Sequence, residues 1–119
     1  MLESALIQPA RHHTALLIRL TMLSKTQIKH LRKLTHDLKP VIMLGQNGFT
    51  EAVLNELEIA LDCHELVKIK LSTADRDQRN QQIEDICKQT RSEQVQSIGK
   101  TVTIFRRNRE KRVIDFPDN

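Results

Sequence analysis

Changes in the spacing of apolar residues along this chain restrict the folds that it can adopt. Segments with an apolar residue every three or four positions, as in amphipathic helices, alternate with short segments whose apolar residues are continuous or alternate, as in strands. The predicted helices are about 25–38, 51–64 and 76–91. The predicted strands are 41–44, 66–71, 94–98 and 101–106. The order is therefore helix, strand, helix, strand, helix, strand, strand.

This order indicates a single α/β domain, for which 119 residues is a suitable length. Two successive strand-helix-strand units should run parallel with right-handed crossovers. The last two strands flank Gly99 and Lys100, a spacing that suits a tight hairpin and adds an antiparallel strand. We therefore expect a four-stranded mixed sheet packed with helices.

Local signals support the boundaries of these elements. Ser24 and Thr50 are suited to cap the first two helices, and Pro40 should end the first one. The run VIML, 41–44, reads as a strand that is buried on both faces. In LVKIKL, 66–71, the alternation predicts a half-exposed strand whose two lysines face away from the apolar side.

Residues 1–21 lack a sustained pattern, so we expect a leader that is disordered or upstream of the native start, followed by a domain at 22–116. The apolar run TALLIRL contains Arg19 and is too short to span a membrane. Cys63 and Cys87, the only cysteines, cannot by themselves make a disulfide framework or a four-ligand zinc site. We expect reduced thiols, a cytoplasmic location, no membrane contact and no cofactor or metal.

The first predicted helix carries a basic stripe. At about 100° per residue its basic side chains fall in one sector, opposite the apolar ones. They are Lys25, Lys29, Arg32, Lys33 and His36. A solvated helix face usually mixes both signs of charge, but Asp37 is the only acidic residue within 23–39. The stripe favours a polyanion partner, with an ordinary solvated face as the alternative.

The tetrapeptide Gly-Gln-Asn-Gly, 45–48, joins the strand at 41–44 to the next helix. Its glycines would let the amides of Gln46, Asn47 and Gly48 approach a phosphate closely, beside the positive end of the helix dipole. A simple turn that needs a positive φ is the alternative interpretation. The KH fold clamps a nucleic-acid backbone with such a loop, although there it joins two helices. The glycine and lysine pattern of a P-loop is absent.

An enzyme is not expected. The candidate bases His30, His36 and His64 have no nucleophile or metal-ligand motif beside them. Without Trp or Tyr, the chain also lacks the aromatic platform that reads bases in RRM domains.

Residues 22–116 resemble the CRM domain in its single-domain bacterial form, YhbY. The resemblance rests on LRKLTHDLKPVIMLGQNGFTEAVLNELEIALDCHELVKIKL and on VQSIGKTVTIFRR. It implies RNA binding in assembly of the large ribosomal subunit, and a fold similar to the C-terminal domain of translation initiation factor three. Its Gly-x-x-Gly loop corresponds to Gly45, Gln46, Asn47 and Gly48, and its basic helix positions to Lys25, Lys29, Arg32 and Lys33.

Three further residues complete the predicted RNA-binding set. Thr50 begins the helix after the loop, and Arg106 and Arg107 open the basic segment RRNREKR, 106–112, nearest to the sheet. That segment either extends an RNA path or is a solvated tail. The partner expected is ribosomal RNA or a precursor of the large subunit, bound by a monomer, with ribosomal proteins as additional partners. The alternative is a protein-docking module without RNA contact, which would use the acidic segment 51–65.

Overall fold

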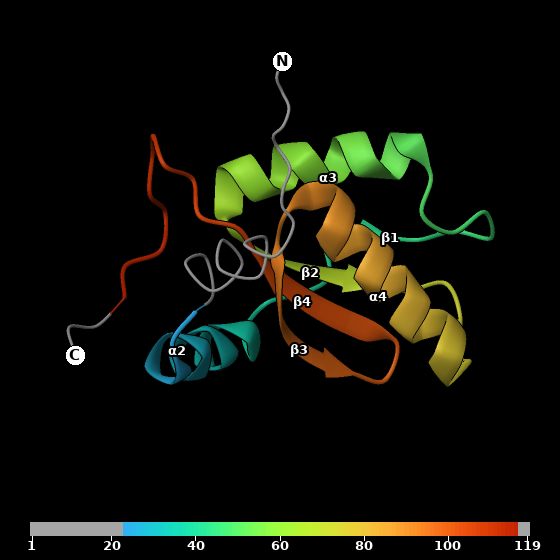
Figure 1. The fold of residues 1–119 in the computed structure, drawn as a ribbon, viewed down its shortest axis with the longest axis horizontal. Helices are drawn as coiled ribbons and strands as arrows, with labels where there is room; N and C mark the ends of the chain where they lie inside the picture. Colours follow the sequence, from blue (N-terminus) through green and yellow to red (C-terminus); the bar gives the residue numbers. More distant parts are fainter. Residues whose placement is uncertain (1–22, 117–119) are drawn as a thin grey trace, which may run out of the picture.

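A four-stranded mixed sheet forms the centre of the protein in the computed structural model, which describes residues 23–116 (Figure 1). The elements follow the predicted order. The helices are α2 (Lys25–Thr35), α3 (Glu51–His64) and α4 (Arg76–Thr90). The strands are β1 (Ile42–Met43), β2 (Leu66–Lys70), β3 (Glu93–Ile98) and β4 (Thr101–Phe105). The leader predicted at 1–21 lies outside the described residues.

The strand order in the sheet is β1-β2-β4-β3. β1 and β2 pair in parallel, as the first strand-helix-strand unit predicts. β4 pairs antiparallel with both β2 and β3, so β2 and β3 run in the same direction without being neighbours. The hairpin that joins β3 to β4 turns at Gly99, whose φ is +56°. The sequence predicted both the hairpin and the mixed sheet, but not that β4 inserts between β2 and β3.

α3 and α4 cover one face of the sheet. Leu57 and Leu61 of α3 and Ile83 and Ile86 of α4 are buried against it. The sheet residues of this core are Ile42, Leu44, Val67, Ile69, Leu71, Val102 and Ile104. Each fully buried aliphatic side chain contributes about 1.5–3 kcal/mol relative to its exposed state, and this is the larger of the two apolar cores among the described residues.

α2 covers only part of the opposite face. Leu31 packs with Leu66, Val95 and Phe105 in a second, smaller core. Phe116, near the C-terminus, packs against the same core and lies edge-on to the ring of His30 at 5.8 Å. The sheet thus carries α3 and α4 on one face, and α2 with the C-terminal segment over part of the other.

Caps define the starts of the helices as predicted. Ser24 forms a capping box with Gln27 at α2, in which each side chain accepts a hydrogen bond from the backbone amide of the other. The Thr50 hydroxyl accepts from the Val53 amide at α3. α2 ends at Thr35, three residues before the predicted end. Beyond it, the amides of Asp37 and Leu38 donate to the carbonyl oxygens three residues earlier, as in a 3₁₀ turn, instead of four residues earlier.

Two predicted burials are wrong. The strand at 41–44 is not buried on both faces, because β1 is an edge strand that α2 does not cover: Val41 is 60% exposed and Met43 is 67% exposed. Lys68, expected in solvent, is half-buried, and its Nζ donates to the carbonyl oxygens of Thr35 and Leu38 at 3.1 Å. The lysine thus pairs with the carbonyl oxygen of Leu38, just past the end of α2, and shares the carbonyl oxygen of Thr35 with the Leu38 amide.

Candidate nucleic-acid interface

The basic stripe lies on the solvent side of α2. Lys25, Lys29 and Lys33 are exposed, while Leu31 and Thr35 on the other side of the helix are buried. No ion pair joins these three lysines to a carboxylate within residues 23–116. Their charges are therefore available to an external anion as far as the described part of the chain is concerned.

Arg32 differs from the three lysines. Its Nε donates to the carbonyl oxygen of Val95 at 3.2 Å. Val95 lies in a bulge of β3, between Gln94 and Gln96, which pair with successive residues of β4. A bulge leaves one residue outside the ladder, and Arg32 satisfies the carbonyl that this leaves free. The residue thus has a structural function in addition to the binding function predicted for it.

The Gly-Gln-Asn-Gly loop is a tight turn. The Gly48 amide donates to the carbonyl oxygen of Gly45 at 3.0 Å, so it is engaged within the turn. Gly48 has a φ of +71°, and a Cβ there would lie 3.4 Å from Nε2 of Gln82, whereas Gly45 has open space around it. The exposed apex, Gln46 and Asn47, is the part of the loop that can meet a ligand.

The start of α3 beside this loop carries negative charge. Thr50 caps the helix and Glu51 stands in its first turn. A shallow cleft of about 380 Å³ next to them is lined by Phe49, Leu54, Asp85 and Gln89 as well. Carboxylates at a helix N-terminus complement its dipole, so they compete with an incoming phosphate there. The predicted attraction of the helix end for phosphate is therefore weakened by the residues around it.

The loop and the basic stripe are not neighbours in space. In Figure 1, α2 lies at the lower left, whereas the loop between β1 and α3 forms the right-hand edge. A ligand that touches both must cross the sheet face between them.

Arg106 points inward toward α3 and α4. Its guanidinium donates to Glu58 Oε1 at 2.8 Å, to Asp62 Oδ1 at 2.9 Å and to the carbonyl oxygen of Thr90 at 2.9 Å. Its side chain is only 20% exposed. Its charge is offset by two carboxylates of the acidic helix, which leaves little for a phosphate.

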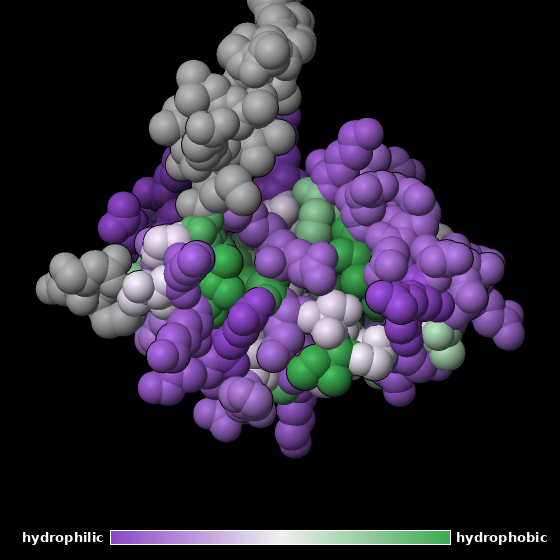
Figure 2. Space-filling view, turned by 60° about the horizontal axis from the view of Figure 1, so that its bottom comes forward, coloured by the Kyte–Doolittle hydropathy of each residue, from purple (hydrophilic) through white to green (hydrophobic). Residues whose placement is uncertain are grey.

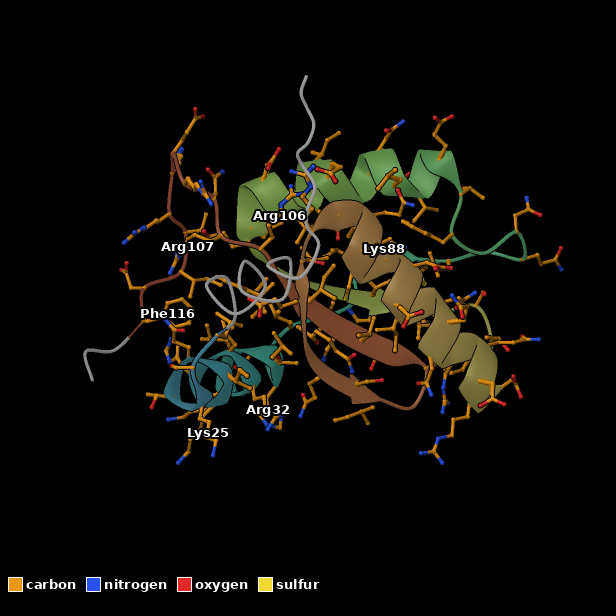
Figure 3. All side chains as sticks on the ribbon, viewed as in Figure 1. Lys25, Arg32, Lys88, Arg106, Arg107 and Phe116 are labelled. Atoms are coloured by element: carbon orange, nitrogen blue, oxygen red, sulfur yellow. The ribbon has the colours of Figure 1, made fainter. Side chains whose placement is uncertain are left out.

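Arg107 is held by Glu65 and by aromatic rings. Its Nη1 donates to Oε1 and Oε2 of Glu65 at 3.1 and 3.3 Å, and to the carbonyl oxygen of Ile114 at 2.8 Å. Its guanidinium stacks 4.9 Å from the centre of the Phe116 ring (Figure 3). Arg106 and Arg107 therefore hold the fold together, and we do not retain them in the proposed interface.

Glu65 is the centre of this arrangement. Its carboxylate is fully buried and also accepts from the amides of Asn108 at 2.6 Å, Val113 at 2.9 Å and Ile114 at 2.7 Å. Burial raises the pKa of the carboxyl, but the three amides and the Arg107 charge outweigh it and lower the pKa below its usual value. No local sequence pattern indicates this role, because the donors come from residues more than forty positions away.

The remaining basic residues of the C-terminal segment behave differently from Arg106 and Arg107. Arg109, Lys111 and Arg112 are exposed, with exposed Glu110 and Asp115 among them. The signs are mixed, so this segment has the character of a solvated surface rather than of a basic stripe.

Cys63 and Cys87 are free thiols, and burial raises the pKa of Cys87.

Within residues 23–116 no cluster of potential metal ligands occurs, and no helix there is long and apolar enough to cross a membrane. What the described residues define is a small α/β domain with one exposed basic helix face and a glycine-bounded turn at the far end of the sheet.

The chain belongs to the CRS1/YhbY (CRM) domain family, which it matches over residues 23–106. A relative in Pseudomonas aeruginosa, named as a probable RNA-binding protein, is 48% identical over 86 residues, which cover 72% of this chain and 83% of the relative. A Haemophilus influenzae protein named as an RNA-binding protein is 44% identical over 94 residues, 79% of this chain and 95% of its own length. Neither name describes an enzyme.

A solved structure shares the fold. The solution structure of a hypothetical protein from Staphylococcus aureus superimposes with a TM-score of 0.70 at 31% identity, and covers 81% of this chain and 100% of its own. The predicted family and the predicted α/β fold are thus confirmed. The RNA-binding residues chosen from the sequence stay predictions.

Proposed function

We propose that this protein binds RNA, specifically ribosomal RNA in precursors of the large ribosomal subunit, as a cytoplasmic monomer that acts in ribosome assembly. The observation that carries the proposal is the face of α2, where Lys25, Lys29 and Lys33 are exposed without an ion pair inside the described part of the chain. Membership of the CRM family and the relatives named as RNA-binding proteins support the choice of RNA.

The lysines of α2 supply the main contact in this proposal. Each lysine that meets a phosphate releases counterions, so affinity falls with salt by about 0.7 logarithmic units per contact on single strands and about 0.9 on duplex. Gln46 and Asn47 add a second contact at the apex of the loop, where their side chains are exposed. Arg32 combines a proposed RNA contact with a structural function, because its Nε donates to the carbonyl oxygen of Val95.

The direct test compares helix variants that leave the fold intact. The double variant Lys29→Gln and Lys33→Gln should weaken binding to a large-subunit ribosomal RNA transcript and reduce the salt slope by about 1.4 to 1.8. Lys88→Gln is the matched control, because Lys88 is an exposed lysine on α4, on the other side of the sheet (Figure 3). An unchanged slope in the double variant would refute the role of α2.

The ribosomal part of the proposal needs a separate experiment. The protein should cosediment with large-subunit precursors in a sucrose gradient, and sequencing of crosslinked RNA should recover large-subunit ribosomal RNA. Charge reversal of Lys29 and Lys33 should move it to the top of the gradient. RNA binding in vitro without ribosomal crosslinks in cells would retain RNA binding and overturn the ribosomal assignment.

The docking alternative uses the acidic helix α3. Arg106 offsets Glu58 and Asp62, which leaves Glu51 and Glu56 as its exposed, unpaired carboxylates within the described residues. The structure therefore favours α2 over α3 as the contact surface. Glu56→Gln should leave RNA binding unchanged.

A further inference from the structure

The part of the sheet face that α2 leaves open lies between the basic helix and the loop. In the sheet register Met43 pairs with Lys70, Lys70 with Thr101, and Thr101 with Ile98. Directly paired residues project from the same face of a sheet. These four side chains therefore form one row across all four strands, which we call the cross-strand row.

The contacts of β2 show which face this is. Side chains two residues apart on a strand share a face. Leu66 packs beneath Leu31 of α2, and Lys68 donates to the end of that helix, so Lys70 projects on the α2 side. Lys70 lies two residues beyond Lys68 on β2, past the part of the sheet that α2 covers.

The cross-strand row is open to solvent among the described residues. Met43 is 67% exposed and Ile98 is 62% exposed, and Lys70 is exposed as well. Val41, at 60% exposure, continues the apolar surface toward α2. In Figure 2, which brings the lower side of Figure 1 forward, hydrophobic groups lie at the surface between hydrophilic side chains.

The charge of the row is positive. Lys70 stands at its centre, and exposed Lys100 lies in the adjoining hairpin turn, where its carbonyl oxygen accepts from the amide of Leu71. Neither β1, β2, β4 nor this turn contains an acidic residue. Glu93 at the start of β3 is half-buried and bonded to the amide of Leu23 at the α2 end of the strand. Such a surface suits single-stranded nucleic acid, because its apolar side chains can contact the bases while its lysines contact the adjoining phosphates.

We propose that the cross-strand row binds a single-stranded segment of RNA on its path from α2 to the Gly-Gln-Asn-Gly loop; this inference rests on the proposed function. Neighbouring strands are about 4.8 Å apart, so the row spans about 14 Å. RRM sheets stack two or three bases on aromatic side chains of their exposed face, whereas the row here offers aliphatic and thioether side chains. Here Met43 and Ile98 contact the bases and Lys70 contacts a phosphate. Because the apolar residues are aliphatic, the contact is tolerant of base identity.

A duplex fits this surface poorly. Its bases are stacked inside, and what it presents to a protein is backbone and groove edges. Only an unpaired strand can place base faces on Met43 and Ile98. The cross-strand row should therefore discriminate between single-stranded and double-stranded RNA, whereas the lysines of α2 should bind both.

The first test measures binding of the full chain to a single-stranded oligonucleotide and to a duplex of equal length. Met43→Glu and Ile98→Glu should each weaken single-strand binding about five- to tenfold, the lower end of the range for loss of one stacked base. Ile59→Glu is the matched control, because Ile59 is 65% exposed on α3. Duplex binding should change less than single-strand binding in both row variants.

The second test does not depend on a substitution. With methyl-labelled protein, the signals of Met43 and Ile98 should shift when the single-stranded oligonucleotide is added, and the Ile59 signal should stay in place. If the α2 signals shift while Met43 and Ile98 do not, the cross-strand row is refuted and the proposed function stands. If no signal shifts with either RNA, the proposed function fails as well. The methyl signals of Met43 and Ile98 could instead shift when residues 1–22 are removed and show no response to RNA. That result would assign the row to residues 1–22 and overturn the inference.

Discussion

Replacement of Glu65 by glutamine should test how the C-terminal segment is held. The carboxylate is fully buried at the junction of α3 and β2, and it receives Arg107 and the amides of Asn108, Val113 and Ile114. Glu65 also adopts a φ of +63°, a conformation that costs a non-glycine residue of order 1–3 kcal/mol. The hydrogen bonds of its side chain offset that strain.

The size of the effect follows from the donors. Glutamine keeps one acceptor oxygen and turns an N–H group toward donors, so at least one buried amide loses its partner, at about 1–3 kcal/mol. The Arg107 charge also loses its counterion, although its side chain is 26% exposed and water screens part of that loss. We expect Glu65→Gln to lower the free energy of unfolding by about 3 kcal/mol.

Urea denaturation followed by circular dichroism is the suitable assay, because the chain has no Trp or Tyr to report by fluorescence. In thermal unfolding followed by the same signal, a loss of about 3 kcal/mol should lower the midpoint Tm by about 12 °C or more in a domain of this size. Glu56→Gln, at an exposed carboxylate of α3, is the control and should change stability by less than about 0.5 kcal/mol. A loss below about 1 kcal/mol in Glu65→Gln would refute the idea that this carboxylate organises residues 106–116.

Three further predictions concern Glu65 in acid, the two glycines of the loop and Lys68. The pKa of Glu65 is lowered on folding, so its contribution to the free energy of unfolding is complete above the unfolded value of about 4.3 and is lost as the pH falls through the folded value. Urea titrations at several pH values should therefore show that acid destabilises the wild type more steeply than Glu65→Gln. Gly48→Ala should cost about 1–2 kcal/mol because of its positive φ, whereas Gly45→Ala should be neutral or slightly stabilising in the same assay; equal effects would contradict the turn geometry. Lys68→Met should cost about 1–2 kcal/mol, because it leaves the Leu38 carbonyl oxygen without a donor among the described residues and removes one of the two donors to Thr35, and Lys70→Met should cost almost nothing.

Local signals in the sequence predicted most of the elements. Ser24 and Thr50 were identified as caps because their hydroxyl groups bond within three residues, a range that the sequence displays directly. The hairpin at Gly99 is local in the same sense. The position of β4 between β2 and β3 depends on pairing over more than thirty residues, and no pattern within one strand encodes it.

The candidate site was predicted less completely for the same reason. The exposure of the α2 lysines follows from helical periodicity, and the structure agrees with it. The basic residues 106 and 107 are adjacent to the sheet in sequence, but their carboxylate partners lie on α3 and at its end, so their inward orientation could not be read from their own segment. The exposure of Met43 likewise depends on where α2 stops covering the sheet.

The two edges of the sheet bear on whether further copies of the chain can add strands to it. An open edge strand offers unpaired amides and carbonyls to another chain, and a long flat edge is a hazard for aggregation. One edge here, β1, is two residues long and follows Pro40 closely. The other, β3, is interrupted by the bulge at Val95, where Arg32 occupies the free carbonyl. Both edges are thus poor templates for strand addition, and an apolar surface can stay open on the sheet without the edges recruiting further copies.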